Sequence, residues 1–521
     1  MEIHLRASNI IRPEKEDYVS FFLIPQRYIL GIMGFLAVVN AYTMRVSLSI
    51  AITEMVAPHD SKEIIDPDSC PVPGQMNSTA SVTNKDILYD WDETTQGLIL
   101  SSFFWGYVIT HLPGGILAEK FGGKYSLGLG ILSTAIFTLI TPWVIFATNG
   151  NWKILVALRV IEGLGEGTTY PALNALLAKW VPIGERAKIG SLVYAGSQIG
   201  TIISNSISGW LINATNEWAS VFYVFGAGGI IWFIVWVLIC YSDPETHPFI
   251  SDEEKMYLKK ELDTSNEKRE IPWGAILTSA PLWALVMAQI GHDWGFFTMV
   301  TDLPKYMSDV LKFKVKENGM WSSLPYAVMW LVSIGSGWLC DWLVSSGYMG
   351  ITFARKFFTS VASIGPAIFI MVASYSGCDK YLTVAMFTIA MGFMGTFYCG
   401  MKVNALDLSP NFAGTLMAIV NGIGAITGIF TPYLAGALTE NHTLKEWRTV
   451  FWISFAVFNV TNLVYCFFGS GEEQKWNNSA KDHEMQARYG SVSSKSKDQS
   501  NGTSRGDKPR NKTGETQENP V

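Results

Sequence analysis

Charged side chains lie inside two long hydrophobic stretches of the sequence. Arg45 stands near the middle of the first stretch, and Arg159, Glu162 and Glu166 lie together in the fourth. An arginine at the centre of a membrane-spanning helix costs about 2.5–3.5 kcal/mol on insertion scales, so it needs a compensating anion or a water-filled cavity. Because a guanidinium matches carboxylate or phosphate oxygens with two parallel hydrogen bonds, we predict that Arg45 binds an anionic substrate. A structural ion pair within the helix bundle is the alternative.

The spacing of Arg159, Glu162 and Glu166 places all three side chains on one face of a helix. Two carboxylates four residues apart repel each other when both are ionised, and burial adds to the cost of their charge. We therefore expect one glutamate to hold a proton near neutral pH, and we predict that Glu162 and Glu166 couple transport to a cation. Arg159 would pair with whichever glutamate remains charged. The alternative is a static Arg159–Glu162 bridge, with Glu166 as a packing residue.

Further polar side chains in the hydrophobic stretches are candidates for contact with the anion, namely Tyr107, Asn174, His292 and Asn404. His292 can titrate near physiological pH, although a histidine beside Asp293 can equally form a satisfied polar pair. The cysteines lack the spacing of a zinc site. The sequence thus predicts no metal and no cofactor, apart from a coupling ion that is either sodium or a proton.

The elements that carry these residues are hydrophobic blocks of about 20 residues or more, each long enough to cross a bilayer core of ~30 Å as a helix. Charged residues make up only 16% of the chain, below the ~25% usual for soluble domains. These features predict an all-α membrane protein with twelve transmembrane helices. The expected spans are 27–56, 95–118, 124–147, 152–180, 188–213, 218–241, 276–302, 319–345, 355–375, 380–407, 412–438 and 447–469.

Two short patterns recur in the same order, which indicates an internal duplication. Gly115 to Lys120 after the second span resembles Gly337 to Asp341 after the eighth, and similar segments around Asn174 and Asn404 end the fourth and tenth spans. We therefore expect two six-helix halves. The predicted order is a cytosolic arm (1–26), an N-terminal half (27–241), a cytosolic linker with a short helix (242–275), a C-terminal half (276–469) and a disordered cytosolic tail (470–521). The linker helix is predicted from the capping-box pattern that begins at Ser251.

Lysine and arginine follow the second, fourth and eighth spans, which favours the cytosol for these connections and for both termini. The first loop on the opposite side is long and acidic and contains the sequon Asn77-Ser78-Thr79, a predicted glycosylation site. Cys70 and Cys378 are the two cysteines expected outside the spans, and whether they form a disulfide stays open. The chain has a net charge of −6 and no basic tract, so no nucleic-acid partner is expected. We expect a monomer in the lipid bilayer, in the plasma membrane rather than in a lysosomal or vesicular membrane.

One stretch, Gly115-x-Leu117-Ala118-Glu119-Lys120-x-Gly122-Gly123-Lys124, resembles the loop signature of the major facilitator superfamily. Three further segments, 40–46, 102–107 and 159–167, are similar to the anion–cation symporter family within it, which includes sialin, the vesicular glutamate transporters and the type I sodium–phosphate cotransporters. The resemblance covers nearly all of residues 27–470. Segment 292–307 is most similar to insect inorganic phosphate cotransporters.

The resemblance implies roles for individual residues. In that family the position of Arg45 is the substrate-binding arginine of the first helix. In its sialin-like members both glutamates of the fourth span are tied to proton coupling, whereas the vesicular glutamate branch has a neutral residue at the position of Glu162. The glutamate branch has a histidine where this chain has Leu100 and an arginine where it has His292, so glutamate is a poor candidate substrate. We expect four charged residues at span ends to form a cytosolic latch that sets the inward–outward equilibrium; these are Glu119, Lys120, Lys124 and Asp341.

The function predicted from these features is a secondary active symporter. It would move a small anion, such as inorganic phosphate or an acidic sugar, by alternating access and couple it to sodium or protons. The sequence contains no Walker phosphate loop, which disfavours ATP-driven pumping. No nucleophile elbow or metal cluster suggests an enzyme. The alternative is a membrane receptor or scaffold that kept the fold of a carrier without transporting a solute.

Overall fold

The computed structural model of the chain describes residues 24–56, 70, 88–263 and 271–477. Within these ranges it is helical, and the predicted spans appear as helices whose ends agree with the prediction to within several residues. The amino-terminal arm, the sequon at Asn77 and the tail beyond residue 477 lie outside the described residues.

The N-terminal group of helices begins at Gln26 and ends at Ile239. Its fourth crossing is divided into two helices, α4 and α5, with a break directly after Glu166. The bounds are α1 Gln26–Met55, α2 Glu93–Phe121, α3 Gly123–Ala147, α4 Trp152–Glu166, α5 Thr169–Trp180, α6 Ile183–Thr215 and α7 Ala219–Ile239.

The C-terminal group repeats this plan, again with a broken fourth crossing. Here α14 continues as a 3-10 turn, η3, before α15 resumes. The bounds are α10 Ala280–Phe297, the π-helical η2 Thr298–Asp302, α11 Leu303–Asp309, α12 Val315–Ser345, α13 Ile351–Tyr375, α14 Lys380–Met394, η3 Gly395–Tyr398, α15 Met401–Leu408, α16 Ala413–Gly424, α17 Thr427–Leu438 and α18 Leu444–Phe468.

Eight of the described helical segments are long and apolar enough to cross a membrane. The remaining four predicted spans, 95–118, 152–180, 188–213 and 276–302, are the more polar or interrupted ones. The pattern is consistent with the twelve-helix prediction, and the predicted all-α membrane fold is confirmed.

Four short helices lie outside the two groups: three lie between them and one follows the second group. The helix predicted from Ser251 is present as α8, whose first turn is capped by the Ser251 hydroxyl accepting from the Glu254 amide at 3.2 Å. Glu254 in turn accepts from the Gln26 amide at 2.8 Å and pairs with the Arg27 guanidinium at 3.1 Å, so α8 is anchored to the start of α1. The bounds are η1 Pro244–Thr246, α8 Asp252–Asp263, α9 Trp273–Leu277 and η4 Lys475–Asn477.

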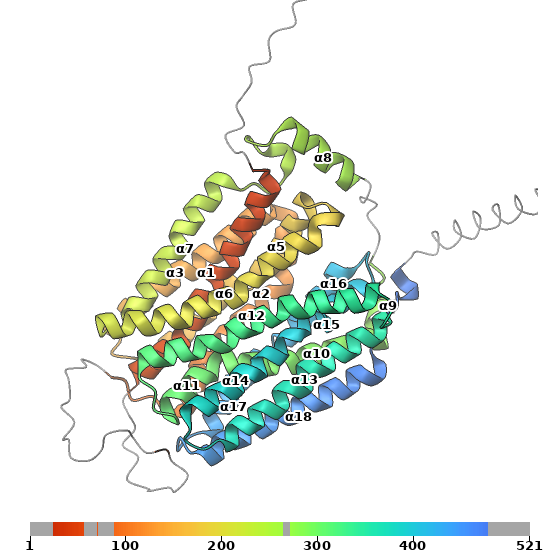
Figure 1. Ribbon diagram of the computed structural model, residues 1–521. Helices are drawn as coiled ribbons and strands as arrows, with labels where there is room; N and C mark the ends of the chain where they lie inside the picture. Colours follow the sequence, from red (N-terminus) through yellow and green to blue (C-terminus); the bar gives the residue numbers. More distant parts are fainter. Residues whose placement is uncertain (1–23, 57–69, 71–87, 264–270, 478–521) are drawn as a thin grey trace, which may run out of the picture.

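The two helix groups lie side by side and meet closely at one end (Figure 1). We call this the loop-side end, because α1 ends there and the loop of residues 57–87 joins it to α2. A Cβ atom built on Gly97 of α2 would lie 2.4 Å from the Pro432 carbonyl oxygen of α17, and α6 and α12 touch similarly at Gly209 and Gly319. Helices can approach so closely only where both carry small residues. The loop-side end is therefore closed in this structure.

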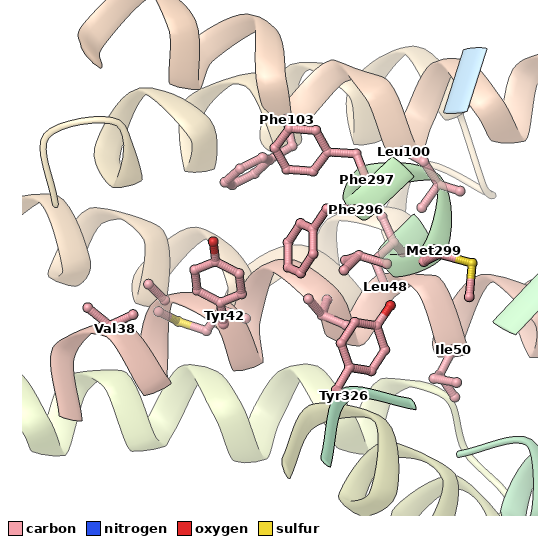
Figure 2. Packing of buried hydrophobic residues seen from close by; sticks show 14 of the residues in the cluster. Val38, Tyr42, Leu48, Ile50, Leu100, Phe103, Phe296, Phe297, Met299 and Tyr326 are labelled. Atoms are coloured by element: carbon pink, nitrogen blue, oxygen red, sulfur yellow. The ribbon is translucent and has the colours of Figure 1, made fainter. Parts of the chain in front are cut away.

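Aromatic side chains from both groups fill the region between them (Figure 2). Phe103 and Phe104 of α2 are buried, and the Phe104 ring meets the Phe297 ring of α10 edge-on, with centroids 4.6 Å apart. Close packing of such rings supplies contact area without leaving polar groups unpaired. The charged residues of the fourth span lie beside this aromatic layer.

A disulfide joins Cys70 of the first long loop to Cys378 of the α13–α14 connection, with Cα atoms 5.4 Å apart. The sequence left this bond open, and the structure shows it. The bond ties together the two helix groups at the loop-side end across a sequence separation of 308 residues.

We expect replacement of Cys70 and Cys378 by serine to lower stability, because the cross-link restricts the unfolded chain. The loss should be about 2–4 kcal/mol, the usual range for a disulfide that closes a long loop. Unfolding of the purified protein in detergent, with and without a reducing agent, measures it. Cys240→Ser is the control, because Cys240 is buried and free; a reductant effect that persists in the double serine variant would contradict the prediction.

Candidate functional site

The centre of the candidate site is an ion pair between Arg45 of α1 and Glu166, the last residue of α4. Both side chains are buried, with relative exposures of 6% and 1%. Two further atoms of the pair, Arg45 Nε and Glu166 Oε2, have no hydrogen-bond partner among the described residues. Buried polar atoms are nearly always satisfied, so this pair has capacity for one more polar ligand.

Four aromatic rings surround the Arg45 guanidinium at 4.7–5.7 Å from its central carbon. Tyr107, predicted as a cavity donor, is one of them. Electron-rich ring faces attract a cation, more strongly where water is excluded. The rings thus help to hold Arg45 in the bundle without neutralising it, and they belong to Tyr42, Phe103, Phe104 and Tyr107.

A second ion pair lies beside the first. The Arg159 guanidinium donates to Glu162 Oε2 at 2.6 Å and to the backbone carbonyl of Arg45 at 3.1 Å. Thr138 donates to the other Glu162 oxygen at 3.3 Å. In this structure Arg159 therefore pairs with Glu162, as in the static-bridge alternative, whereas Glu166 pairs with Arg45 and is no mere packing residue.

The approach of α4 to α2 explains why glycines surround these charges. A Cβ atom on Gly163 would lie 1.9 Å from the Phe103 carbonyl oxygen, and one on Gly167 would lie 2.5 Å from the Tyr107 carbonyl oxygen. The two backbones touch, so only glycine fits at these positions. This contact brings the aromatic face of α2 against both ion pairs.

In the C-terminal group, His292 of α10 stacks on Phe397, with ring centroids 3.4 Å apart. Its neighbour Asp293 accepts a hydrogen bond from the Gln289 side-chain amide at 2.7 Å. Among the described residues, the hydrogen bonds therefore do not join His292 to Asp293. Close by, the Lys402 ammonium donates to Asn421 Oδ1 at 2.6 Å. From its place near the inner end of the tenth span, Lys402 is expected to be a structural or interfacial residue.

Asn174 and Asn404 occupy equivalent places in the two groups, and each is hydrogen-bonded to a tyrosine of its own group. Asn174 accepts from Tyr194, and Asn404 donates to Tyr465. Neither hydrogen bond reaches Arg45. Asn404 Oδ1 remains without a partner among the described residues, whereas Asn174 is exposed.

Three of the four predicted latch residues, Lys120, Lys124 and Asp341, form no ion pair with one another in the part of the chain that the structure describes. Lys124 is buried, with its ammonium 3.9 Å from the centre of the Tyr241 ring. Lys120 and Asp341 are exposed, and the Glu119 side chain lies outside the described atoms.

The loop-side end contains a charged cluster that connects the two groups of helices. Glu93, the first residue of α2, pairs with Lys305 of α11. His442, between α17 and α18, lies 3.4 Å from Glu93 and 3.5 Å from Asp309. Sequence reasoning missed Glu93 and His442, because nothing in either local segment marks it as the partner of a distant residue.

His442 lies outside the spans and makes this cluster sensitive to pH. Burial opposes charge on the imidazole, but the nearby carboxylates of Asp309 and Glu93 outweigh burial and raise the pKa of His442. Lys305 acts in the opposite direction. Protonated His442 therefore strengthens the closed loop-side end. This stabilisation is complete below the ordinary histidine pKa of ~6.5 and is lost as the pH rises through the raised value.

We expect acidification on the loop side to hold this end closed and His442→Gln to remove that response. Spin labels on two exposed residues of this end, Glu217 and Tyr381, report the separation of the two groups as a function of pH. His247→Gln is the control, because His247 lies in the linker region near η1. An unchanged pH response in His442→Gln would contradict the assignment.

Comparison with known proteins supports the fold and the family. Residues 30–430 match the family model of the Major Facilitator Superfamily. A "Putative inorganic phosphate cotransporter" of Drosophila ananassae is 41% identical over 482 residues, which are 91% of this chain and 98% of the relative. Sialin of Homo sapiens is 40% identical over 460 residues, 86% of this chain and 90% of the relative.

The fold is also similar to that of solved transporters. The crystal structure of a D-xylose–proton symporter superposes with a TM-score of 0.63 over 86% of this chain and 100% of that chain, at 13% sequence identity. The relatives are transporters and not enzymes, in agreement with the sequence prediction. The chain therefore belongs to the major facilitator superfamily, in the anion–cation symporter family together with sialin and the inorganic phosphate cotransporters.

Proposed function

We propose that the protein is a symporter that carries a small anion together with a proton by alternating access. The observation that supports this proposal most directly is the buried Arg45–Glu166 pair with its two unpartnered atoms. Arg45 can offer its full charge to an anion only when Glu166 no longer competes for it. A proton on Glu166 removes that competition, so the anion and the proton favour each other's binding.

The neighbouring pair makes this exchange possible without an exposed charge in the bundle. Arg159 remains neutralised by Glu162, and its hydrogen bond to the Arg45 carbonyl holds α1 against α4. When the anion leaves, Glu166 releases its proton and pairs with Arg45 again. For one negative charge of the anion, the Arg45–Glu166 pair is then neutral both empty and loaded, which keeps the cost of moving it through the closed bundle low.

The names of the relatives suggest which anions to test. A guanidinium binds the oxygens of a phosphate or of a carboxylate equally well in geometric terms. Inorganic phosphate and acidic sugars are therefore the first candidates, because the relatives include a phosphate cotransporter and sialin. Sodium is the other candidate for the coupling ion.

Uptake into proteoliposomes tests the proposal. Labelled phosphate and labelled sialic acid are each offered with an inward proton gradient, with an inward sodium gradient and with neither. We expect accumulation of one anion under the proton gradient. Accumulation under the sodium gradient alone would replace the proton by sodium, and no uptake under any gradient would favour the receptor or scaffold function.

We also propose that both termini face the cytosol and that the protein resides in the plasma membrane. The Cys70–Cys378 bond supports this orientation, because disulfides persist in oxidising compartments, and a loop-side end outside the cytosol agrees with that. Asn77 in the same loop would then be glycosylated. Glycosidase treatment of the protein from cells, compared with Asn77→Gln, tests the orientation, and surface biotinylation tests the location.

A further inference from the structure

Lys402 is a cation of the C-terminal group that is not engaged in an ion pair within the described residues. Its ammonium donates to Asn421 and lies 5.6 Å from the centre of the Phe397 ring. It is half-buried. It interacts electrostatically with Asp293, but that carboxylate takes its hydrogen bond from Gln289 instead. Lys402 therefore keeps donor capacity that the described residues do not use.

The surroundings of Lys402 connect it to the Arg45 site. Gln198 of α6 donates to the hydroxyl of Tyr398, which adjoins Phe397, the ring beside Lys402, so the Lys402 segment meets the N-terminal group there. The charges of both Lys402 and Arg45 also act on His111 of α2. His111 also stacks near Tyr107, with ring centroids 5.3 Å apart, and Tyr107 in turn covers Arg45. Arg45 and Lys402 thus face the same region between the two groups.

Two buried nitrogens in this region lack a partner. His111 Nδ1 and His292 Nδ1 have no hydrogen bond among the described residues, although the side chains are only 4% and 8% exposed. His292 stacks on Phe397, the ring that also lies beside Lys402. Unsatisfied polar atoms of this kind, in the region of an ammonium that has no ion pair among the described residues, indicate a place for a polar ligand.

The interrupted helices point to the same region. Glu166 ends α4 where the fourth crossing breaks, and Lys402 follows the break at 395–400 in the corresponding crossing of the other group. Substrate sites in transporters built from repeats lie where broken helices of the repeats meet. Each break thus lies next to one charged residue: Glu166, which pairs with Arg45, and Lys402.

We propose that Lys402 is a second cationic contact for the substrate and that the preferred substrate is a compact anion with two negative charges. Hydrogenphosphate and a short dicarboxylate share this chemistry. This inference rests on the proposed transport function and narrows it. Arg45 takes one charge after a proton has neutralised Glu166, whereas Lys402 takes the other without a competing ion pair. An anion held by both groups also stabilises the arrangement in which they close around it.

Lys402→Gln tests the inference in proteoliposomes, with labelled phosphate and labelled succinate as the doubly charged anions and labelled sialic acid as the singly charged one. We expect half-saturating concentrations for the doubly charged anions to rise about tenfold or more, as for loss of a hydrogen bond between charged groups. The half-saturating concentration for sialic acid should change little. Lys402→Arg should retain the preference for two charges. In the unchanged protein, a lower half-saturating concentration for phosphate than for succinate would identify hydrogenphosphate as the substrate type, and the reverse would identify a short dicarboxylate.

Lys356→Gln is the matched control, because Lys356 is a half-buried lysine in the first turns of α13. If Lys402→Gln does not yield a folded protein, thermal stabilisation of the unchanged protein and of Lys402→Arg by phosphate, succinate and sialic acid measures the same preference. Equal losses for singly and doubly charged anions, or no preference for two charges in the unchanged protein, would overturn the role of Lys402 and leave the symporter function intact. No transport of any anion by the unchanged protein would overturn both.

Discussion

Replacement of Arg45 by alanine is expected to abolish anion uptake. The guanidinium carries one of the two unpartnered atoms of the pair, and its charge cannot be replaced by the aromatic rings around it. Loss of one member of a buried, hydrogen-bonded charge pair costs about 2 kcal/mol or more in binding, which corresponds to about thirtyfold in affinity. Uptake of the transported anion into proteoliposomes under a proton gradient measures the loss.

The control for this prediction must separate transport from folding. Arg45→Ala leaves Glu166 buried without its partner, and an unpaired buried charge can destabilise a protein by about 3–5 kcal/mol. The double variant Arg45→Ala with Glu166→Gln removes both charges and should regain stability without regaining uptake. Arg45→Lys should retain a fraction of the uptake, because it keeps the charge but not the planar fork. Undiminished uptake by Arg45→Ala would remove Arg45 from the substrate site.

Replacement of Glu166 by glutamine is expected to uncouple the anion from its driving ion. Glutamine resembles the protonated glutamate in shape and in the lack of charge, so Arg45 stays available to the anion. Because position 166 can no longer gain or lose a proton, a proton gradient should no longer concentrate the anion. Exchange of anion across the membrane should continue, since it needs the loaded site alone.

Two assays on the same proteoliposomes distinguish these activities. Counterflow of labelled anion against internal unlabelled anion reports exchange, and accumulation under a proton gradient reports coupling. Glu162→Gln is an informative comparison, because Glu162 pairs with Arg159 and its loss should leave a buried guanidinium without its partner. Normal accumulation by Glu166→Gln would show that this carboxylate is not the coupling group.

The fold could be predicted from the sequence because its hydrophobic blocks have the length that a bilayer requires. The helices from Gln26 to Met55 and from Gly123 to Ala147 follow such blocks almost to the residue. The linker helix could also be predicted, since a capping serine at 251 acts on its own neighbours. Breaks inside spans were not predicted: residues 152–180 were expected as one continuous span, whereas α4 ends at Glu166, where it packs against α2.

The candidate site was predictable only in part, and the reason is the range of the interactions. Helical spacing showed that Arg159, Glu162 and Glu166 share one face, but it could not show which glutamate each arginine meets. The pairing of Arg45 with Glu166, and of Glu93 with Lys305, joins residues on separate helices. Neither partner carries a local signal for the other, and the Cys70–Cys378 bond stayed open for the same reason.

The amino-acid sequence by itself determined that charges lie deep inside apolar helices, and the cost of charge in lipid then required that each be neutralised or reach a cavity. The tertiary structure alone decided how they are neutralised. It placed α1 and α4 so that Arg45 meets Glu166, and it placed Lys402 of the other group against Asn421 and the Phe397 ring. Desolvation acts on each residue separately, whereas the choice of partner depends on which helices pack together.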